Sequence, residues 1–179
     1  SRTASNGWLS RVLRGWRFPV GQLVLVCLVA VVVRVPFVSA GIGMDEGGYA
    51  YVAWRWMHGA RLYNDAWIDR PQALILLYRA ILTASPSIEA IRITALACGV
   101  ALSLLLLILG RCLWGPTAGL TAGLLYALIG VSPGIDGFTL NAELPAATAV
   151  SCAAVCVSLG MRREAAIGGG EGGVFGGVP

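Results

Sequence analysis

A long apolar segment near the N-terminus limits what this chain can fold into. From Pro19 to Ala40 the sequence is almost continuously apolar, and it contains the runs Leu23-Val24-Leu25-Val26 and Val31-Val32-Val33. At a rise of about 1.5 Å per residue, a helix of this length crosses a hydrocarbon core of about 30 Å. The segment therefore predicts a transmembrane helix over 19–40.

The composition of the whole chain agrees with this prediction. Of its 179 residues, 57% are hydrophobic and only 12% are charged, and the mean hydropathy is +0.76. Charged residues make up about 25% of a typical soluble domain, so we expect an integral membrane protein. The net charge of +4 comes from arginines that are scattered along the chain. No nucleic-acid partner is expected, because such a partner needs clustered basic residues.

The rest of the chain divides into apolar segments and polar connections. Further membrane-spanning helices are predicted over 91–110, 117–131 and 144–160. The expected fold is an all-α integral membrane protein with about four transmembrane helices within 19–160. Near the third span, Gly115, Gly119 and Gly123 follow one another at four-residue spacing, which permits close helix contact in lipid.

The arginines near the helix ends predict the orientation. Residues 1–18 form a basic flank, and Arg111 and the pair Arg162-Arg163 fall on the same side if four spans alternate. Cytoplasmic loops are enriched in Arg and Lys, so we expect a multi-pass protein of the plasma membrane with a cytoplasmic N-terminus. Most acidic residues then lie on the external face: Asp45, Glu46, Asp65, Asp69, Asp136 and Glu143.

The first external connection, over 41–88, holds most of the acidic and aromatic residues of the chain. Loops of this length are usually functional. Two helices are predicted within it, both lying on the membrane surface. The first covers Tyr49–His58 and is closed by Gly59. The second covers Gln72–Leu82 and is opened by Pro71.

A cleaved signal peptide is an alternative interpretation of the first apolar segment. A basic flank, an apolar core and Val38-Ser39-Ala40 before Gly41 also fit that pattern. Against it, the apolar part is long and is interrupted by Arg34 and Pro36. Arg34 is costly in lipid, so it is expected to face a polar interior or to reach the outer headgroups.

Both ends of the chain are typical of a fragment. The sequence begins without Met, and the cytoplasmic tail 161–179 is a Gly-rich linker that cannot bury a core. The four helices are therefore expected to be the opening of a larger bundle, and to be inactive alone. The cysteines lie in or at the ends of apolar segments, without a C-x-x-C pair, and predict buried thiols with neither a disulfide nor a metal site: Cys27, Cys98, Cys112, Cys152 and Cys156.

Several motifs occur in order along the chain: Arg34-x-Pro36, Asp45-Glu46-Gly47-x-Tyr49, Gly59-x-x-x-Tyr63-x-Asp65-x-x-x-Asp69-Arg70-Pro71 and Asn141-x-Glu143. This set resembles the N-terminal part of the GT-C membrane glycosyltransferases. The most similar members are the bacterial family that includes the aminoarabinose transferases and the protein O-mannosyltransferases. The resemblance covers residues 19–160, which is only part of a usual family member.

The resemblance implies an inverting enzyme that transfers a sugar from a polyprenyl-phosphate donor. The acceptor is a hydroxyl or amine of a glycan, lipid or protein on the external face. By the same resemblance, Asp45 is the catalytic base, Glu46 helps to hold the acceptor, and Arg70 contacts the lipid phosphate. Gln72 stands where many members have a second Pro. The motifs add further candidate substrate-binding residues: Tyr49, Asp65, Asp69, Asn141 and Glu143.

The residue types themselves suit this chemistry. A hydroxyl is a poor nucleophile, so a carboxylate within about 3 Å must take its proton during attack. The leaving phosphate needs a fixed cation, and the planar guanidinium of Arg offers two parallel donors. No cofactor is required by these residues, and the sequence leaves open whether a divalent metal assists.

Each candidate residue also has a structural interpretation. Asp45 and Glu46 could instead stabilise the N-terminus of the helix that follows them. Arg70 could be an interfacial residue, and Glu143 could cap the fourth helix. For the whole chain, the alternatives are a non-catalytic truncated membrane protein, a subunit whose loop binds a partner, or part of a transporter that uses Arg34 as an intramembrane charge.

Overall fold

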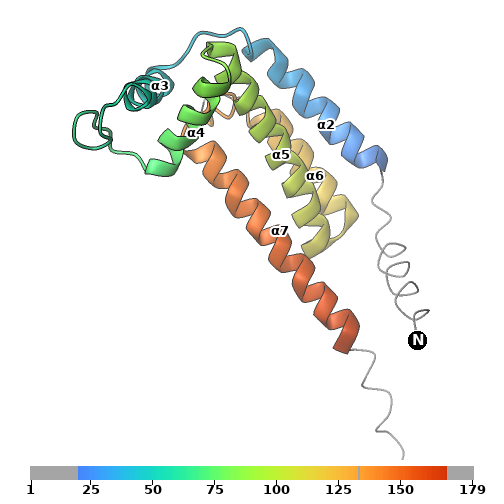
Figure 1. Ribbon diagram of the computed structural model, residues 1–179. Coiled ribbons are helices and arrows are strands. Elements are labelled where there is room, and N and C mark those ends of the chain that lie inside the picture. The colour runs from blue at the N-terminus through green and yellow to red at the C-terminus, as the bar shows by residue number, and fades with distance from the viewer. Residues whose placement is uncertain (1–19, 133, 169–179) are drawn as a thin grey trace, which may run out of the picture.

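The chain folds into long helices that pack side by side, with two shorter helices beside one end (Figure 1). The computed structural model describes residues 20–132 and 134–168. The predicted flank 1–18 and most of the predicted tail 161–179 lie outside the described residues. Within them the chain is helical and contains no β-strand, which confirms the all-α fold class.

Three helices of the described chain are long and apolar enough to cross a membrane. They overlap the predicted spans 19–40, 91–110 and 144–160, and the last two are longer than predicted. They are α2 (Val20–Arg34), extended by the 3-10 turn Val35–Phe37, α5 (Ile88–Trp114) and α7 (Glu143–Gly168). Helix α6 (Pro116–Ile129) occupies the remaining predicted span, 117–131. Its 14 residues are the fewest of these helices, so its crossing of the membrane stays a prediction.

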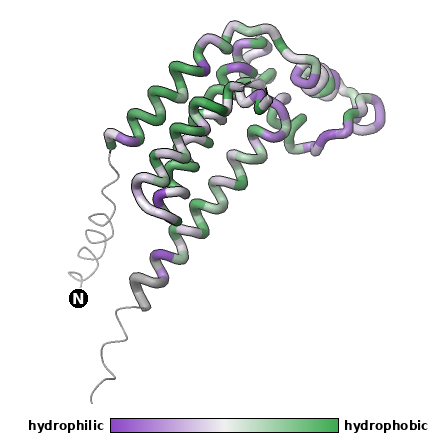
Figure 2. The backbone as a smooth tube through the Cα atoms, turned by 180° about the vertical axis from the view of Figure 1, so that it is seen from behind, coloured by the Kyte–Doolittle hydropathy of each residue, from purple (hydrophilic) through white to green (hydrophobic). Residues whose placement is uncertain are grey.

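Helices α5 and α6 form an antiparallel hairpin, against which α2 and α7 pack. Helices α3 (Met44–Met57) and α4 (Gln72–Ala84) pair with each other beside the end where α5 begins. We call this end, formed by residues 38–43, 58–71, 85–87 and 134–142, the loop end. Hydrophilic residues gather there and near the C-terminal end of α7, and hydrophobic residues dominate between them (Figure 2).

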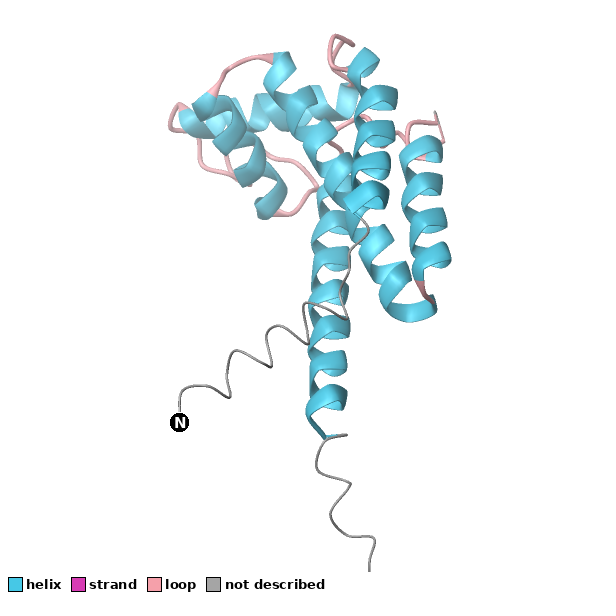
Figure 3. Ribbon diagram, turned by 90° about the vertical axis from the view of Figure 1, so that its right-hand side faces the viewer, coloured by secondary structure: helices cyan, strands magenta, loops and turns pink. Residues whose placement is uncertain are grey.

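Helix α3 begins earlier than the sequence predicted. It starts at Met44 rather than Tyr49, so Asp45 and Glu46 lie in its first turn. The predicted stop is confirmed, because Gly59 has a φ of +94° just after the helix. Helix α4 begins at Gln72 after Pro71, as predicted. Figure 3 shows that helices occupy most of the described chain. The longest connections join α3 to α4 and α6 to α7.

Glycines allow α5 and α6 to approach closely. A Cβ at Gly119 would lie 2.4 Å from the carbonyl oxygen of Leu107, and a Cβ at Gly123 would lie 3.0 Å from that of Ser103. The predicted close helix contact is therefore confirmed for these two glycines. Gly115 differs, because its φ of +102° places it in the turn between the helices.

Arg34 faces the protein interior and not the outer headgroups, which were its two predicted positions. Its side chain is buried, and Nη1 donates to the carbonyl oxygen of Ala127 at 3.1 Å and to that of Ala30 at 3.3 Å. Its guanidinium also lies 5.4 Å from the ring centre of Tyr126. Arg34 thus satisfies a carbonyl near the end of α6, where the helix leaves such groups unpaired.

The predicted burial of the cysteines is wrong for Cys152 and Cys156, which are exposed on α7, while Cys112 is buried. The reason is that α7 packs mainly on α5, so most of its surface has no protein neighbour in the described part of the chain. In the membrane this surface would face lipid or another helix.

Candidate functional site

Glu46 lies in a buried ion pair. Its carboxylate oxygens Oε1 and Oε2 are 3.0 and 2.9 Å from Nη1 and Nη2 of Arg92, and both side chains are 2% exposed. The carboxylate also accepts the backbone N–H of Leu140 at 2.7 Å and that of Gly43 at 3.1 Å. This geometry favours the structural interpretation of Glu46, because an acceptor molecule has no free oxygen to approach.

Arg92 is a residue that the sequence interpretation missed. It lies in the second turn of α5, near the loop end, and is buried. Besides Glu46, it donates to the carbonyl oxygens of Ala40, Gly41 and Phe138. One signal could have found it: an arginine inside an apolar helix is costly unless it is paired. The acid nearest the start of that helix, Glu89, is exposed and is not its partner.

Asp45, by contrast, is accessible. It is exposed in the first turn of α3 and makes no hydrogen bond or ion pair within the described chain. Tyr49 follows four residues later, so the two side chains share one face of the helix. Asp45 therefore has a free carboxylate beside the residues that hold Arg70.

The guanidinium of Arg70 is hydrogen-bonded through Nε and has only one distant ion-pair contact at Nη1. Nε donates to the hydroxyl of Tyr49 at 2.9 Å, and Nη1 lies 3.8 Å from the Asp69 carboxylate. The hydroxyl of Tyr63 donates to the carbonyl oxygen of Arg70 at 2.7 Å. The hydrogen bond to Tyr49 raises the pKa of Arg70, and the charges of Asp69 and Glu143 add to this. Arg70 thus stays cationic, with its two Nη groups largely unengaged.

Tyr78 of α4 contacts both Tyr49 and the segment that precedes α7. Its ring packs edge to face on Tyr49, with ring centres 5.6 Å apart, and its hydroxyl donates to the carbonyl oxygen of Leu140 at 2.6 Å. Burial raises the pKa of Tyr78, and the nearby charge of Glu46 adds to this effect. Asp45 is also close enough to contribute, so the two acids, Tyr49 and Tyr78 belong to one cluster.

The start of α7 supplies two further candidate residues. Asn141 accepts the backbone N–H of Leu144 at 3.2 Å through Oδ1, so it is Asn141 that caps α7. Glu143 is exposed in the first turn, and its charge reaches Arg70. The charge of Glu143 therefore stabilises the cation Arg70. Asn141 stabilises the start of α7.

Asp65 stands apart from this cluster. Its carboxylate is 3.1 Å from Nε of Arg61, and it also accepts the backbone N–H of Arg61 and the side chain of Asn64. The hydrogen bonds from Arg61 hold the pKa of Asp65 below its usual range. Asp65 thus closes a turn of its own.

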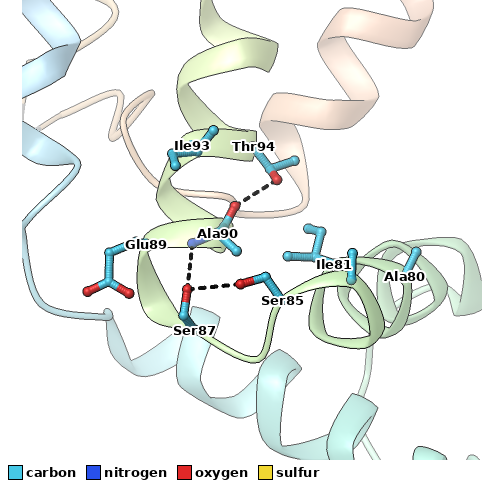
Figure 4. A pocket seen from close by; sticks show the side chains of 9 residues that line it. Ala80, Ile81, Ser85, Ser87, Glu89, Ala90, Ile93 and Thr94 are labelled. Carbon is cyan, nitrogen blue, oxygen red and sulfur yellow. Dashed lines mark hydrogen bonds between the residues drawn. The ribbon is translucent and has the colours of Figure 1, made fainter.

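A separate groove of about 470 Å³ lies where α4 ends and α5 begins (Figure 4). Ser87, one of the residues that line the groove, caps α5 by accepting the backbone N–H of Ala90 at 3.2 Å. None of the candidate site residues lines this groove. Its lining is mostly apolar: Ala80, Ile81, Ala84, Ser85, Ser87, Glu89, Ala90, Ile93 and Thr94.

The described residues contain no group of three or more His, Cys, Asp or Glu side chains that could hold a metal ion. No protein-family model, curated protein or solved structure matches this chain. The functional interpretation consequently depends on its own residues. Of the predicted site residues, Tyr49 and Asp69 lie against the partly buried guanidinium of Arg70. Glu143 is near enough for its charge to act on Arg70, and Asp45 lies one helical turn from Tyr49.

Proposed function

We propose that this chain is part of a membrane glycosyltransferase similar to the GT-C enzymes. The enzyme would transfer a sugar from a polyprenyl-phosphate donor to a hydroxyl or amine of a glycan, lipid or protein. One observation carries the proposal: an accessible carboxylate, Asp45, lies one helical turn from Tyr49, which holds the cation Arg70.

In this proposal Asp45 acts as the base. The acceptor O–H gives its proton to the carboxylate while the acceptor oxygen bonds to the anomeric carbon of the sugar. The bond between that carbon and the phosphate oxygen breaks in the same step, so the configuration is inverted. An exposed carboxylate without an ion-pair partner, such as Asp45, can accept this proton.

Arg70 then stabilises the leaving phosphate. Because Tyr49 engages Nε, the two Nη groups remain available as a fork for phosphate oxygens. Asp69 is only a weak competitor, since its carboxylate is 3.8 Å from Nη1 and 70% exposed. Tyr49 and Asp69 are positioning residues in this proposal, and Glu143 supplies negative charge near the acceptor.

The proposal puts the loop end on the external face of the plasma membrane, with α6 as the fourth crossing and α3 and α4 at the interface. Two arginines at the opposite end support this orientation. Arg111 donates to the side chain of Gln22 at 3.3 Å, and Arg162 donates to the carbonyl oxygen of Cys112. Both therefore lie where α5 ends, away from α3 and α4.

The test is an assay of sugar transfer from radiolabelled polyprenyl-phosphate donors, in membranes that contain the complete natural protein. We expect Asp45→Asn to lower the rate by about 10²-fold or more, which is the usual effect of losing a general base. Asp65→Asn is the matched control and should stay active, because Asp65 closes a separate turn with Arg61.

Transfer that survives Asp45→Asn would exclude Asp45 as the base. A complete absence of transfer from every donor would instead support the alternative, a non-catalytic membrane protein or a partner-binding subunit. A transporter would keep its function after the Asp45→Asn change.

A further inference from the structure

We propose that Glu46 and Arg92 are positioning residues, which fix Asp45 relative to the start of α7. The role assigned to Asp45 comes from the proposed function, whereas the contacts that lead to the inference do not depend on it.

Arg92 uses all five of its N–H groups within the protein. Nε donates to the carbonyl oxygen of Ala40 at 3.4 Å. Nη1 donates to Oε1 of Glu46 at 3.0 Å and to the carbonyl oxygen of Phe138 at 3.3 Å. Nη2 pairs with Oε2 of Glu46 at 2.9 Å and donates to the carbonyl oxygen of Gly41. No donor remains for a ligand.

Glu46 is equally saturated. Each carboxylate oxygen accepts one N–H of Arg92 and one backbone N–H, from Leu140 at 2.7 Å and from Gly43 at 3.1 Å. The pair is also buried, where an ion that loses its partner is strongly destabilised. Neither residue can therefore bind substrate without breaking the network, which leaves a positioning role.

The network joins segments that are distant in sequence. It connects the residues after α2, the first turn of α3, the second turn of α5 and residues 138–140 before α7. Helix α4 joins through Tyr78, which donates to the carbonyl oxygen of Leu140. Asp45 directly precedes Glu46, and Asn141 directly follows Leu140. The ion pair therefore sets the separation between Asp45 and the start of α7.

The experiment compares hydrogen–deuterium exchange in the protein in lipid nanodiscs, for the wild type, Glu46→Gln, Arg92→Lys and Arg61→Lys. The last variant is the matched control, because Arg61 forms an exposed ion pair with Asp65. We expect Glu46→Gln and Arg92→Lys to speed exchange about tenfold or more in residues 40–46 and 138–142. In these two variants, exchange within α5 and α7 should stay unchanged. In the Arg61→Lys control, exchange should match that of the wild type throughout.

Transfer kinetics in the same variants give the second readout. With the base misplaced, kcat for each folded enzyme molecule should fall about tenfold or more, because a base acts in the transition state, while KM for the donor, which Arg70 contacts, stays constant. A purely structural role would lower only the amount of folded enzyme and leave this kcat unchanged, and this result would overturn the proposal. Exchange that rises uniformly along the helices, or that does not change in residues 138–142, would also overturn it.

These outcomes separate the two proposals. If the wild type transfers no sugar, the proposed function fails. The exchange pattern then still decides whether the ion pair fixes the loop end locally.

Discussion

The guanidinium of Arg34 fills the space that a side chain at residue 99 would need, because a Cβ at Gly99 would lie 2.4 Å from Nε of Arg34. Gly130 makes similar room, with its Cβ position 2.8 Å from Nη2. Arg34 ends α2 and Gly99 lies within α5. A charged side chain thus sets the distance between two long helices.

We expect Gly99→Ala to destabilise the fold by about 1–3 kcal/mol, the usual cost of overpacking a core. The Arg34 side chain, which donates to the carbonyl oxygen of Ala127, must shift to make room for this Cβ. The matched control is Gly160→Ala in α7, whose Cβ would meet nothing within 4 Å. This change should be neutral or slightly stabilising, because alanine favours helices. Unfolding in mixed micelles measures the free energy of unfolding of both variants. Equal changes in the two variants would contradict the predicted clash with Arg34.

Gly119→Ala should cost more than Gly99→Ala, about 3 kcal/mol or above. Its Cβ would lie 2.4 Å from the carbonyl oxygen of Leu107 and 2.7 Å from the backbone nitrogen of Arg111. These are backbone atoms of α5, so the two helices must separate. Gly21→Ala is the control, since no atom lies within 4 Å of its Cβ. The same unfolding assay applies, and a stable Gly119→Ala variant would show that the helices pack more loosely.

Tyr78 should keep its proton in alkaline solution for as long as the protein stays folded. Burial raises the pKa of Tyr78, so the stability linked to it is fully present below the unfolded pKa of about 10 and is lost as the pH rises above it. Phenolate absorbance, compared between the wild type and Tyr78→Phe, should assign to Tyr78 a late step that coincides with unfolding. Ionisation of Tyr78 together with the exposed Tyr51 would contradict its burial.

Tyr49→Phe should weaken binding of polyprenyl phosphate about threefold to tenfold, because it removes one hydrogen bond that orients Arg70. Tyr51→Phe is the matched control, since its hydroxyl bonds to Arg55 on the exposed surface. Equilibrium binding to the protein in nanodiscs measures the dissociation constants. Unchanged affinity in Tyr49→Phe would mean that Arg70 does not need this support.

The long helices could be predicted from sequence because an apolar run of about 20 residues is what a bilayer demands. The sequence predicts the start of α3 too late, and the reason is local. Gly43, which precedes the helix, is a weaker cap signal than Ser, Asp or Asn, and Gly47-Gly48 within the first turns lower the helix propensity. The first turn depends instead on Glu46, whose carboxylate accepts the N–H of Gly43.

The candidate site was predictable only where its residues are neighbours in sequence. Asp45 and Tyr49 share a helix face by their spacing. The contacts of Tyr49 with Arg70 and of Glu46 with Arg92 join residues that the sequence separates by 21 and 46 positions. Such pairs depend on how the helices pack, and no local pattern specifies them. The resemblance implies that Glu46 holds the acceptor, whereas the structure provides it with a buried partner.

The saturated network around Arg92 also has a consequence for the order of biosynthesis. Ala40 and Glu46 leave the ribosome before Arg92, but Phe138 and Leu140 follow only after the hairpin of α5 and α6 is complete. Until that point the carboxylate of Glu46 lacks the N–H of Leu140, and the guanidinium of Arg92 lacks the carbonyl oxygen of Phe138. The network is consequently completed only after the hairpin of α5 and α6, and a nascent chain that stops before residue 138 lacks the contacts of Phe138 and Leu140 with the segment that carries Asp45.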